Sequence, residues 1–128
     1  KPSEQKQIAG FDFSHLEQWE NNRLNVTLVN GEWKASDPKA KPSQADMKDW
    51  FDSYWRNISV QRVETYTPDR RMTYPSFEVK LADGKKVHFD KIQESPELLI
   101  GRPDEGTLYH VPMDVGFTLL NPPINLGK

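Results

Sequence analysis

The segment from residue 42 to residue 58 spaces its large apolar side chains three and four positions apart. This spacing gathers them into one stripe along a helix of about 3.6 residues per turn. Ser43 supplies an N-cap oxygen, and Asp46 three positions later corresponds to the acidic partner of a capping box. We therefore predict a helix from about Gln44 to Asn57, and its apolar face requires a sheet or a partner to cover it. The stripe is formed by Met47, Trp50, Phe51, Tyr54, Trp55 and Ile58.

Two alternating segments lead into tight turns and predict β-hairpins. Leu24 to Val29 alternates and precedes Asn30-Gly31, a pair that tolerates the positive φ angles of a type I′ turn. Phe77 to Leu81 alternates in the same way before Asp83-Gly84. Further strands are predicted at Val60 to Tyr66, at Leu98 to Ile100 with Gly101 ending it, and at Thr107 to Val111. The structure of Leu16 to Glu20 stays open, and Val115 to Leu120 is a short helix or a last strand.

The composition bounds the class of protein. A chain of 128 residues is long enough for one hydrophobic core. The chain has a net charge of −2, whereas nucleic-acid-binding proteins normally carry a basic stripe, so we expect no nucleic-acid partner. No segment approaches the roughly 20 apolar residues that a membrane helix needs. The absence of cysteine excludes disulfides, thiolate metal sites and cysteine nucleophiles.

These elements predict an α+β fold, in which one amphipathic helix packs on a mostly antiparallel sheet built of hairpins. Such a sheet rests one face on the helix and leaves the other face to solvent. We predict a single domain over residues 8–122. Residues 1–7 are expected to form a flexible tether, and residues 123–128 a C-terminal tail.

The histidines are the main candidates for chemistry. His88 and Asp90 would project from the same face of one strand, and His110 could lie on a neighbouring strand, so a metal or acid–base site is conceivable. The interpretation we favour is that these are solvated strand residues opposite the core face. Ser14 precedes His15, but no Gly-x-Ser-x-Gly elbow surrounds it. We therefore predict no catalytic residue, no metal ligand and no cofactor.

The longest predicted loop, residues 67–75, carries the one candidate contact site. Arginine, tyrosine and methionine are enriched in protein interfaces. A partner-contact patch and an ordinary exposed connection both remain open for this loop. The residues concerned are Arg70, Arg71, Met72 and Tyr74.

Several short motifs occur in an order that resembles a bacterial envelope family known only as a domain of unknown function. They are Gly31-Glu32-Trp33, Pro38, Ala45-Asp46, Phe77 to Leu81 with Asp83-Gly84, Leu99-Ile100-Gly101, and Gly106 to Val111 with Asp114-Val115. Members are usually held by one N-terminal membrane helix and are sometimes encoded beside gliding-type ABC transporter components. The resemblance implies a location on the periplasmic side of the inner membrane, with an anchor preceding Lys1, and an envelope protein as partner. It implies no catalytic residue.

Three hypotheses for function follow. The leading one is a non-catalytic envelope-associated interaction or accessory module, for which the sequence fixes neither the process nor the oligomeric state. The alternative is a carrier that binds a small ligand or peptide in a cleft between helix and sheet. An apolar pocket beside Trp50 and Trp55 would favour the carrier, and solid packing would favour the interaction module. An enzyme would require His88, Asp90 and His110 to converge.

Overall fold

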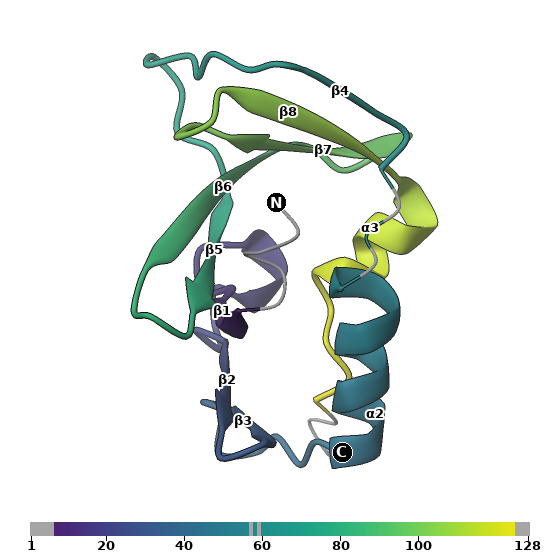
Figure 1. Cartoon of the computed structure of the whole chain (residues 1–128). Coiled ribbons are helices and arrows are strands. Elements are labelled where there is room, and N and C mark those ends of the chain that lie inside the picture. The colour runs from purple at the N-terminus through teal and green to yellow at the C-terminus, as the bar shows by residue number, and fades with distance from the viewer. Residues whose placement is uncertain (1–6, 57, 59, 125–128) are drawn as a thin grey trace.

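The computed structural model describes residues 7–56, 58 and 60–124. Within these residues it confirms an α+β fold, an antiparallel sheet of eight strands with helices on one face (Figure 1). The strands are β1 (Ile8–Asp12), β2 (Asn25–Val29), β3 (Glu32–Ala35), β4 (Arg62–Thr65), β5 (Ser76–Leu81), β6 (Lys86–Gln93), β7 (Glu97–Arg102) and β8 (Thr107–Pro112). The helices are the 3₁₀-helix η1 (Glu17–Trp19), the α-helices α2 (Gln44–Trp50) and α3 (Met113–Leu119), and the π-helix η2 (Phe51–Trp55).

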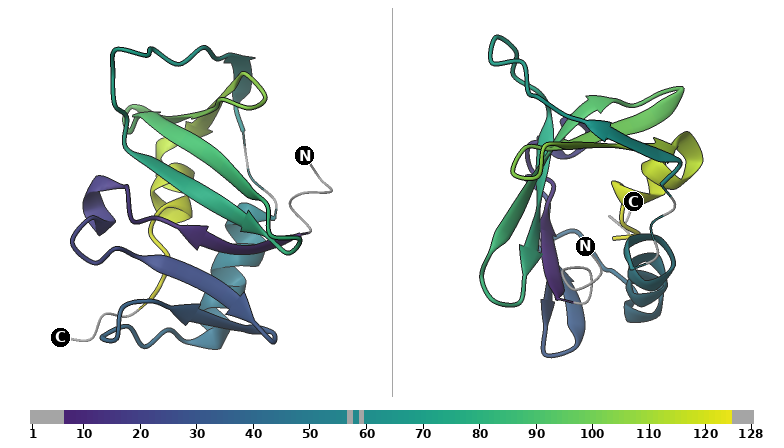
Figure 2. Two further views of the ribbon diagram at one scale, coloured as in Figure 1. Left: turned by 90° about the vertical axis from the view of Figure 1, so that its left-hand side faces the viewer. Right: turned by 45° about the horizontal axis from the view of Figure 1, so that its top comes forward.

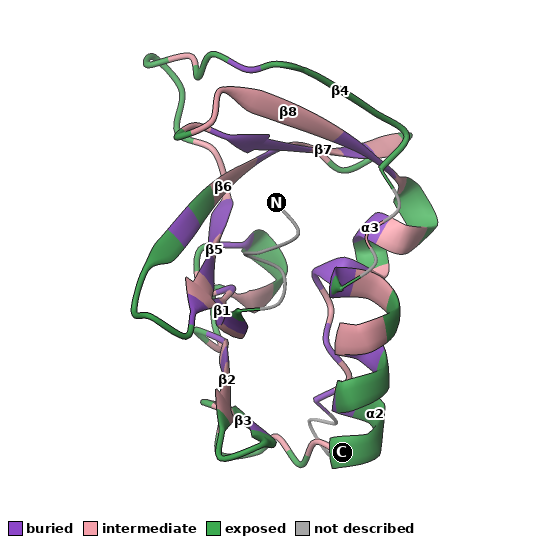
Figure 3. Ribbon diagram, in the orientation of Figure 1, coloured by how far each residue is buried: buried purple, intermediate pink, exposed green. Residues whose placement is uncertain are grey.

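The sheet is a single curved layer. Its strands follow the order β3-β2-β1-β5-β6-β7-β8-β4, and each neighbouring pair is antiparallel. It bends so that β1–β3 on one side and β4, β7 and β8 on the other face a common hollow (Figures 1 and 2). The helices α2, η2 and α3 lie in that hollow. Side chains that alternate toward the concave face therefore form the core, whereas β4 is exposed along its length (Figure 3).

The predicted helix begins where its cap indicated, but it changes type halfway. The Ser43 side chain accepts a hydrogen bond from the Asp46 N–H at 3.3 Å. From Phe51 the helix continues as a π-helix, in which N–H groups bond to carbonyls five residues back. The Arg56 N–H accordingly donates to Phe51 O at 3.0 Å. This wider winding lets Trp50 and Trp55, five positions apart, both face the core with 3% and 2% exposure.

Phe11 on β1 is the centre of the packed core. It is fully buried, and its ring centroid lies 4.6 Å from that of Trp55 and 5.3 Å from that of Trp50. Phe13 stacks on it at 5.4 Å, and Trp33 lies 6.1 Å away. The predicted apolar stripe of the helix is thus covered by the sheet, and large aromatic side chains make most of the contact.

Three indole groups attach α3 to the rest of the core. The Trp50 N–H donates to Thr118 O at 2.6 Å and the Trp55 N–H to Leu119 O at 3.0 Å. The Trp19 N–H donates to Leu120 O at 2.8 Å. The last carbonyls of a helix have no partner within the helix. Here these carbonyls are satisfied by tryptophans from two distant parts of the chain.

The structure settles two segments whose type the sequence left open, and it corrects one predicted strand end. Leu16 to Glu20 contains a 3₁₀-turn, and Val115 to Leu120 belongs mostly to the helix α3. Gly101 does not end its strand, because β7 continues to Arg102. A Cβ on Gly101 would come within 2.5 Å of the Tyr66 ring, so the absence of a side chain is what lets this ring lie on the sheet.

Part of the expected C-terminal tail packs on the domain. Ile124, in the segment expected to be a tail, is buried, and its carbonyl accepts from the Lys41 N–H at 2.9 Å. Three parts of the predictions lie outside the described residues: residues 1–6 of the expected tether, residues 125–128 of the expected tail and Asn57 of the predicted helix.

The Asn30-Gly31 turn has φ values of 51° and 81°, as the hairpin prediction requires.

Candidate functional site

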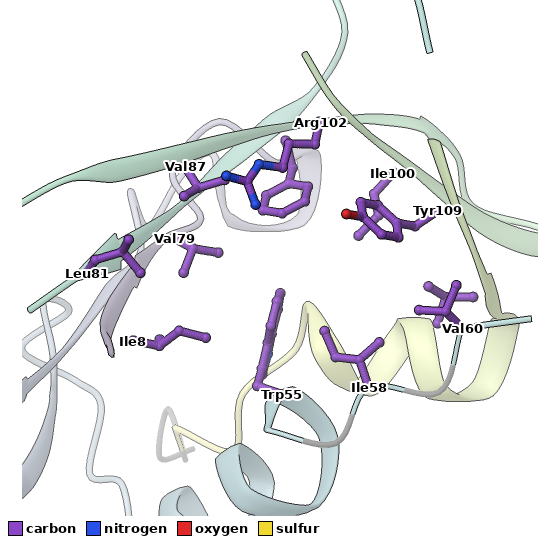
Figure 4. Close-up of a pocket in the computed structure, with 12 residues that line it drawn as sticks. Ile8, Trp55, Ile58, Val60, Val79, Leu81, Val87, Ile100, Arg102 and Tyr109 are labelled. Carbon is purple, nitrogen blue, oxygen red and sulfur yellow. The ribbon is translucent and has the colours of Figure 1, made fainter. Parts of the chain in front are cut away.

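A partly open pocket of about 140 Å³ lies on the concave side of the sheet, beyond the end of the helix (Figure 4). Trp55, Ile58 and Val60 form one side of it, on η2 and the segment that leads to β4. Strands β5 to β8 form the opposite side. The pocket therefore lies between the helical segment and the sheet.

Strand alternation supplies the sheet side of the pocket. Val79 on β5 lies opposite Val87 on β6, and Ile100 on β7 lies opposite Tyr109 on β8. Directly opposite residues point to the same face of a sheet, so these four side chains line the pocket together. The valines and Ile100 are buried, and Tyr109 is half-buried. The result is a continuous apolar wall.

Aromatic rings add flat surfaces to this wall. The Phe89 ring stacks on Phe77, with centroids 5.2 Å apart and planes at 11°. On its other side it lies 6.4 Å from the Tyr109 ring. The Trp55 ring lies on the helical side of the pocket, across from the Tyr109 ring (Figure 4). Because its N–H already donates to Leu119 O, this indole contributes to the pocket mainly as carbon surface.

Arg102 is the charged residue among those that line the pocket, and carboxylates surround it. Its Nε lies 2.7 Å from Asp104 Oδ1, its Nη2 lies 3.1 Å from Asp104 Oδ2, and its Nη1 lies 3.5 Å from Glu105 Oε2. The hydrogen bond from this guanidinium holds the pKa of the Asp104 carboxyl below its usual value. The Tyr109 hydroxyl also donates to Glu105 Oε1 at 3.0 Å. The positive charge is thus matched locally, and the site does not select for an anion.

The size and lining of the pocket limit what it can hold. Pockets for drug-sized ligands measure about 300–1,000 Å³. An engineered apolar cavity of about 150 Å³ binds benzene. A pocket of about 140 Å³ therefore fits one aromatic ring or a short branched alkyl group, either as a whole molecule or as the apolar part of a larger ligand.

The first candidate group for chemistry, His88 with Asp90, lies on the convex face. The His88 Nε2 is 2.8 Å from Asp90 Oδ1, and its Nδ1 is 3.9 Å from Glu78 Oε2. The side chain of His88 is 45% exposed, as the prediction of a solvated residue requires. Tyr66 donates to Asp90 Oδ2 at 2.6 Å, and burial together with this bond raises the pKa of the Tyr66 hydroxyl.

His110 does not join that group, and the prediction that it is solvated is wrong. It is 3% exposed, with Nδ1 2.7 Å from Glu97 Oε1 and Nε2 bonded to Glu64 Oε2. The hydrogen bond with Glu97, aided by Glu64 and opposed by burial, raises the pKa of His110 above its ordinary value. Because β7 separates β6 from β8, the two histidines form separate clusters with their own carboxylates.

Other candidates of the sequence lie in ordinary surroundings. Ser14 donates to Asp12 Oδ1 through both its N–H, at 2.9 Å, and its hydroxyl, at 2.5 Å, so it belongs to a local turn. Among the described residues, no group of three or more histidine and acidic side chains is placed to hold a metal ion.

Three of the four residues of the loop patch are exposed, and Tyr74 is half-buried. The side chain of Arg71 is 90% exposed, although its guanidinium contacts Asp69 at 3.2 Å, and Met72 is 57% exposed. Tyr74 Oη lies 3.8 Å from Met72 Sδ. Arg70 is also exposed, so the four residues remain candidates for a partner contact.

The sequence suggested a cleft between helix and sheet only as an alternative, and it did not indicate which strand residues would line that cleft. Alternation assigned Val79 and Val87 to a core face, and a short apolar run assigned Ile100 to a buried strand. Solid packing is the usual outcome for such residues. The alternation of a strand does not tell how much of the sheet the helix covers. The signal available in the sequence was a mismatch, because one helix stripe of six residues had to cover a sheet with many more apolar positions.

Comparison with known proteins found no match: no family model, no curated protein and no solved structure matches this chain. The envelope-family resemblance therefore stays a prediction. Among the described residues, no helix has both the length and the apolar character needed to cross a membrane.

Proposed function

We propose that this protein is a non-catalytic binding module whose pocket takes up the apolar group of a small ligand or peptide. The observation that carries the proposal is the apolar pocket between Trp55 and strands β5–β8. Such a pocket is costly to leave empty, because its lining loses packing contacts and stays exposed to water. A ligand with an aromatic ring or a branched alkyl end would restore those contacts.

The packing of the helix supports a binding site at its end rather than along its length. Trp50 is 3% exposed, and its ring contacts Phe11, Trp33 and Phe13. Aromatic rings therefore fill this half of the concave side. The carrier hypothesis therefore applies to the region beyond Trp55.

The pocket offers binding without an arrangement for catalysis. Its polar groups are the paired Arg102 and the Tyr109 hydroxyl, and each is bonded to a carboxylate. The His88 and His110 clusters project from the opposite face of the sheet, since their strand neighbours Val87 and Val111 line the pocket.

A location in the bacterial envelope, with an anchor preceding Lys1 and an envelope protein as partner, remains part of the proposal and rests on the motif resemblance alone. The role of interaction module is the second candidate, and the exposed Arg71 and Met72 support it. Reading the gene upstream of the codon for Lys1 tests the location. A hydrophobic anchor supports it, and a cytoplasmic start contradicts it.

Binding is tested by titrating the protein with toluene and with indole while observing ¹³C-labelled methyl groups by NMR. We expect saturable shifts at Val79, Val87 and Ile100, and none at Val26 in the packed half. Val79→Phe places a ring in the pocket and should weaken binding at least tenfold. Val29→Phe is the matched control, because Val29 is 41% exposed and lies outside the pocket. Binding with equal affinity in both variants, or shifts only at Val26, would refute the assignment.

A further inference from the structure

The two edges of the sheet differ in how their backbone groups are used. At the β3 edge, the Trp33 N–H donates to Gln44 Oε1 at 2.7 Å. The Gln44 Nε2 donates back to Trp33 O at 2.8 Å. The side-chain amide therefore occupies the place of a further strand, which is one way in which proteins protect a sheet edge from pairing. Among the described residues, no side-chain amide bonds to the outer edge of β4 in this way.

The β4 edge is open. β4 pairs with β8 on one side and has no neighbour on the other within the described sheet. The bond from the Tyr66 N–H to Gly106 O fixes which residues face β8. By antiparallel alternation, the N–H and C=O groups of Val63 and Thr65 point away from the sheet. All four residues of β4 are exposed, and Val63 is 58% exposed.

We propose that β4 pairs with β4 of a second copy of this chain, antiparallel and centred on Val63. This inference does not depend on the proposed ligand pocket. In that register the outward groups of Val63 bond to those of its symmetry mate. Arg62 then lies opposite Glu64 of the second copy, and the reverse pair forms by symmetry. Opposite charges directly across two strands are stabilising.

The sequence Arg62-Val63-Glu64 favours a second copy over an unrelated strand. When two copies run antiparallel, the positive residue of each lies opposite the negative residue of the other. Val63 lies opposite Tyr109, so it projects from the concave face, and pairing would bring two exposed valines together. The paired stretch is short, because the Gln61 N–H already donates to His110 O at 2.7 Å. The expected dimer is therefore weak and depends on concentration.

Cross-linking tests the centre of the pairing, because the chain contains no cysteine. In a hydrogen-bonded antiparallel pair the Cα atoms lie about 5.5 Å apart, a separation that a disulfide spans. Val63→Cys should therefore form a disulfide-linked dimer under mild oxidation. Thr65→Cys is the control on the same strand, because its symmetry mate lies several residues away. Val29→Cys is the control for an exposed position on another strand. Cross-linking of Thr65→Cys or Val29→Cys as fast as Val63→Cys overturns the proposed centre.

Sedimentation equilibrium of the unmodified chain, from micromolar to millimolar concentration, tests the pairing itself. We expect a reversible dimer whose dissociation constant rises at least tenfold in Val63→Lys and in Arg62→Glu. Away from β4, Val29→Lys makes the same substitution as Val63→Lys, and Lys34→Glu reverses a charge as Arg62→Glu does. Both should leave the dimer intact. Circular dichroism establishes that each variant is folded. A chain that stays monomeric throughout, or a dimer unchanged in Val63→Lys, overturns the proposal.

Discussion

The two halves of the concave side are built from the same kind of residue and end in different states. Under α2, Phe11 is fully buried and has Trp50 and Trp55 within 5.3 Å between ring centroids. Beyond Trp55, strands β5–β8 present Val79, Val87 and Ile100 to a pocket of about 140 Å³. One half is packed and the other is partly open.

The difference arises from the lengths of the covering elements. The helical segment runs from Gln44 to Trp55, and the Trp55 ring at its end still contacts Phe77 on β5. The shorter α3 is held at the side by the indoles of Trp50 and Trp55. Beyond Trp55, the apolar face of strands β5–β8 is therefore covered only in part. A pocket can thus result from a sheet that is wider than its helix, without polar residues to mark it.

The largest expected effect lies in the packed half. Phe11→Ala removes a fully buried ring and should lower the free energy of unfolding by about 3–5 kcal/mol. Phe117→Ala is the control, because Phe117 is 66% exposed, and its effect should stay within about 0.5 kcal/mol. Urea denaturation measures both. Similar losses in the two variants would contradict a core centred on Phe11.

Adding one methylene to each half compares their packing directly. Val26→Ile adds volume at a fully buried position and should cost about 1–3 kcal/mol. Val79→Ile extends into the pocket and should be neutral or stabilise the fold by up to about 1 kcal/mol. Thermal and urea unfolding provide the measurement. If Val79→Ile is as destabilising as Val26→Ile, the open half is in fact packed.

The stability of the strands around β8 should depend on pH through His110, which projects from the face of the sheet opposite the pocket. Its pKa is raised in the folded state, so its contribution to stability is fully present below the ordinary imidazole pKa of 6.5. That contribution is lost as the pH rises through the raised pKa. His110→Gln should remove this pH dependence at a cost of about 1 kcal/mol. Hydrogen exchange of β4 and β8 amides as a function of pH is the measurement, and amides of β2 are the internal control. A pH dependence that persists in His110→Gln would assign it to another group.

The smallest effect on folding is expected in the loop after β4. Reversing both charges in Arg70→Glu/Arg71→Glu should change the free energy of unfolding by less than about 0.5 kcal/mol, because Arg71 is 90% exposed. Toluene binding in the pocket should not change. If the loop contacts an envelope partner, a pull-down should lose that partner. Retention of every partner by this variant would count against the contact patch.

Local signals in the sequence were enough for most of the fold. The Ser43 cap and the apolar stripe after it predicted the start of the helix and its buried face. The Asn30-Gly31 pair predicted a hairpin turn that has the expected positive φ angles. Alternation from Phe77 to Leu81 predicted which side chains face the core. These predictions succeeded because a cap, a turn and a periodicity each depend on neighbours within a few residues.

Local signals suggested a cleft between helix and sheet only as an alternative, and they could not indicate its exact position or its lining. The π-helix η2 buries Trp55, and this burial depends on the packing of Trp55 against Phe11, which lies far away in the sequence. The burial of His110 depends on β4 and β7 bringing Glu64 and Glu97 to its two nitrogens. Neither arrangement has a local pattern, because each depends on which strands become neighbours.

The residues alone thus determined where helices and strands form and which faces avoid water, because those choices are made over a few positions of chain. The register and curvature of the sheet, together with the reach of the helix, decided where apolar surface is fully covered and where a pocket remains. They also decided which edge of the sheet is closed by Gln44 and which is left open at Val63. The physical reason is that packing depends on the distances between segments, and those distances exist only in the folded chain.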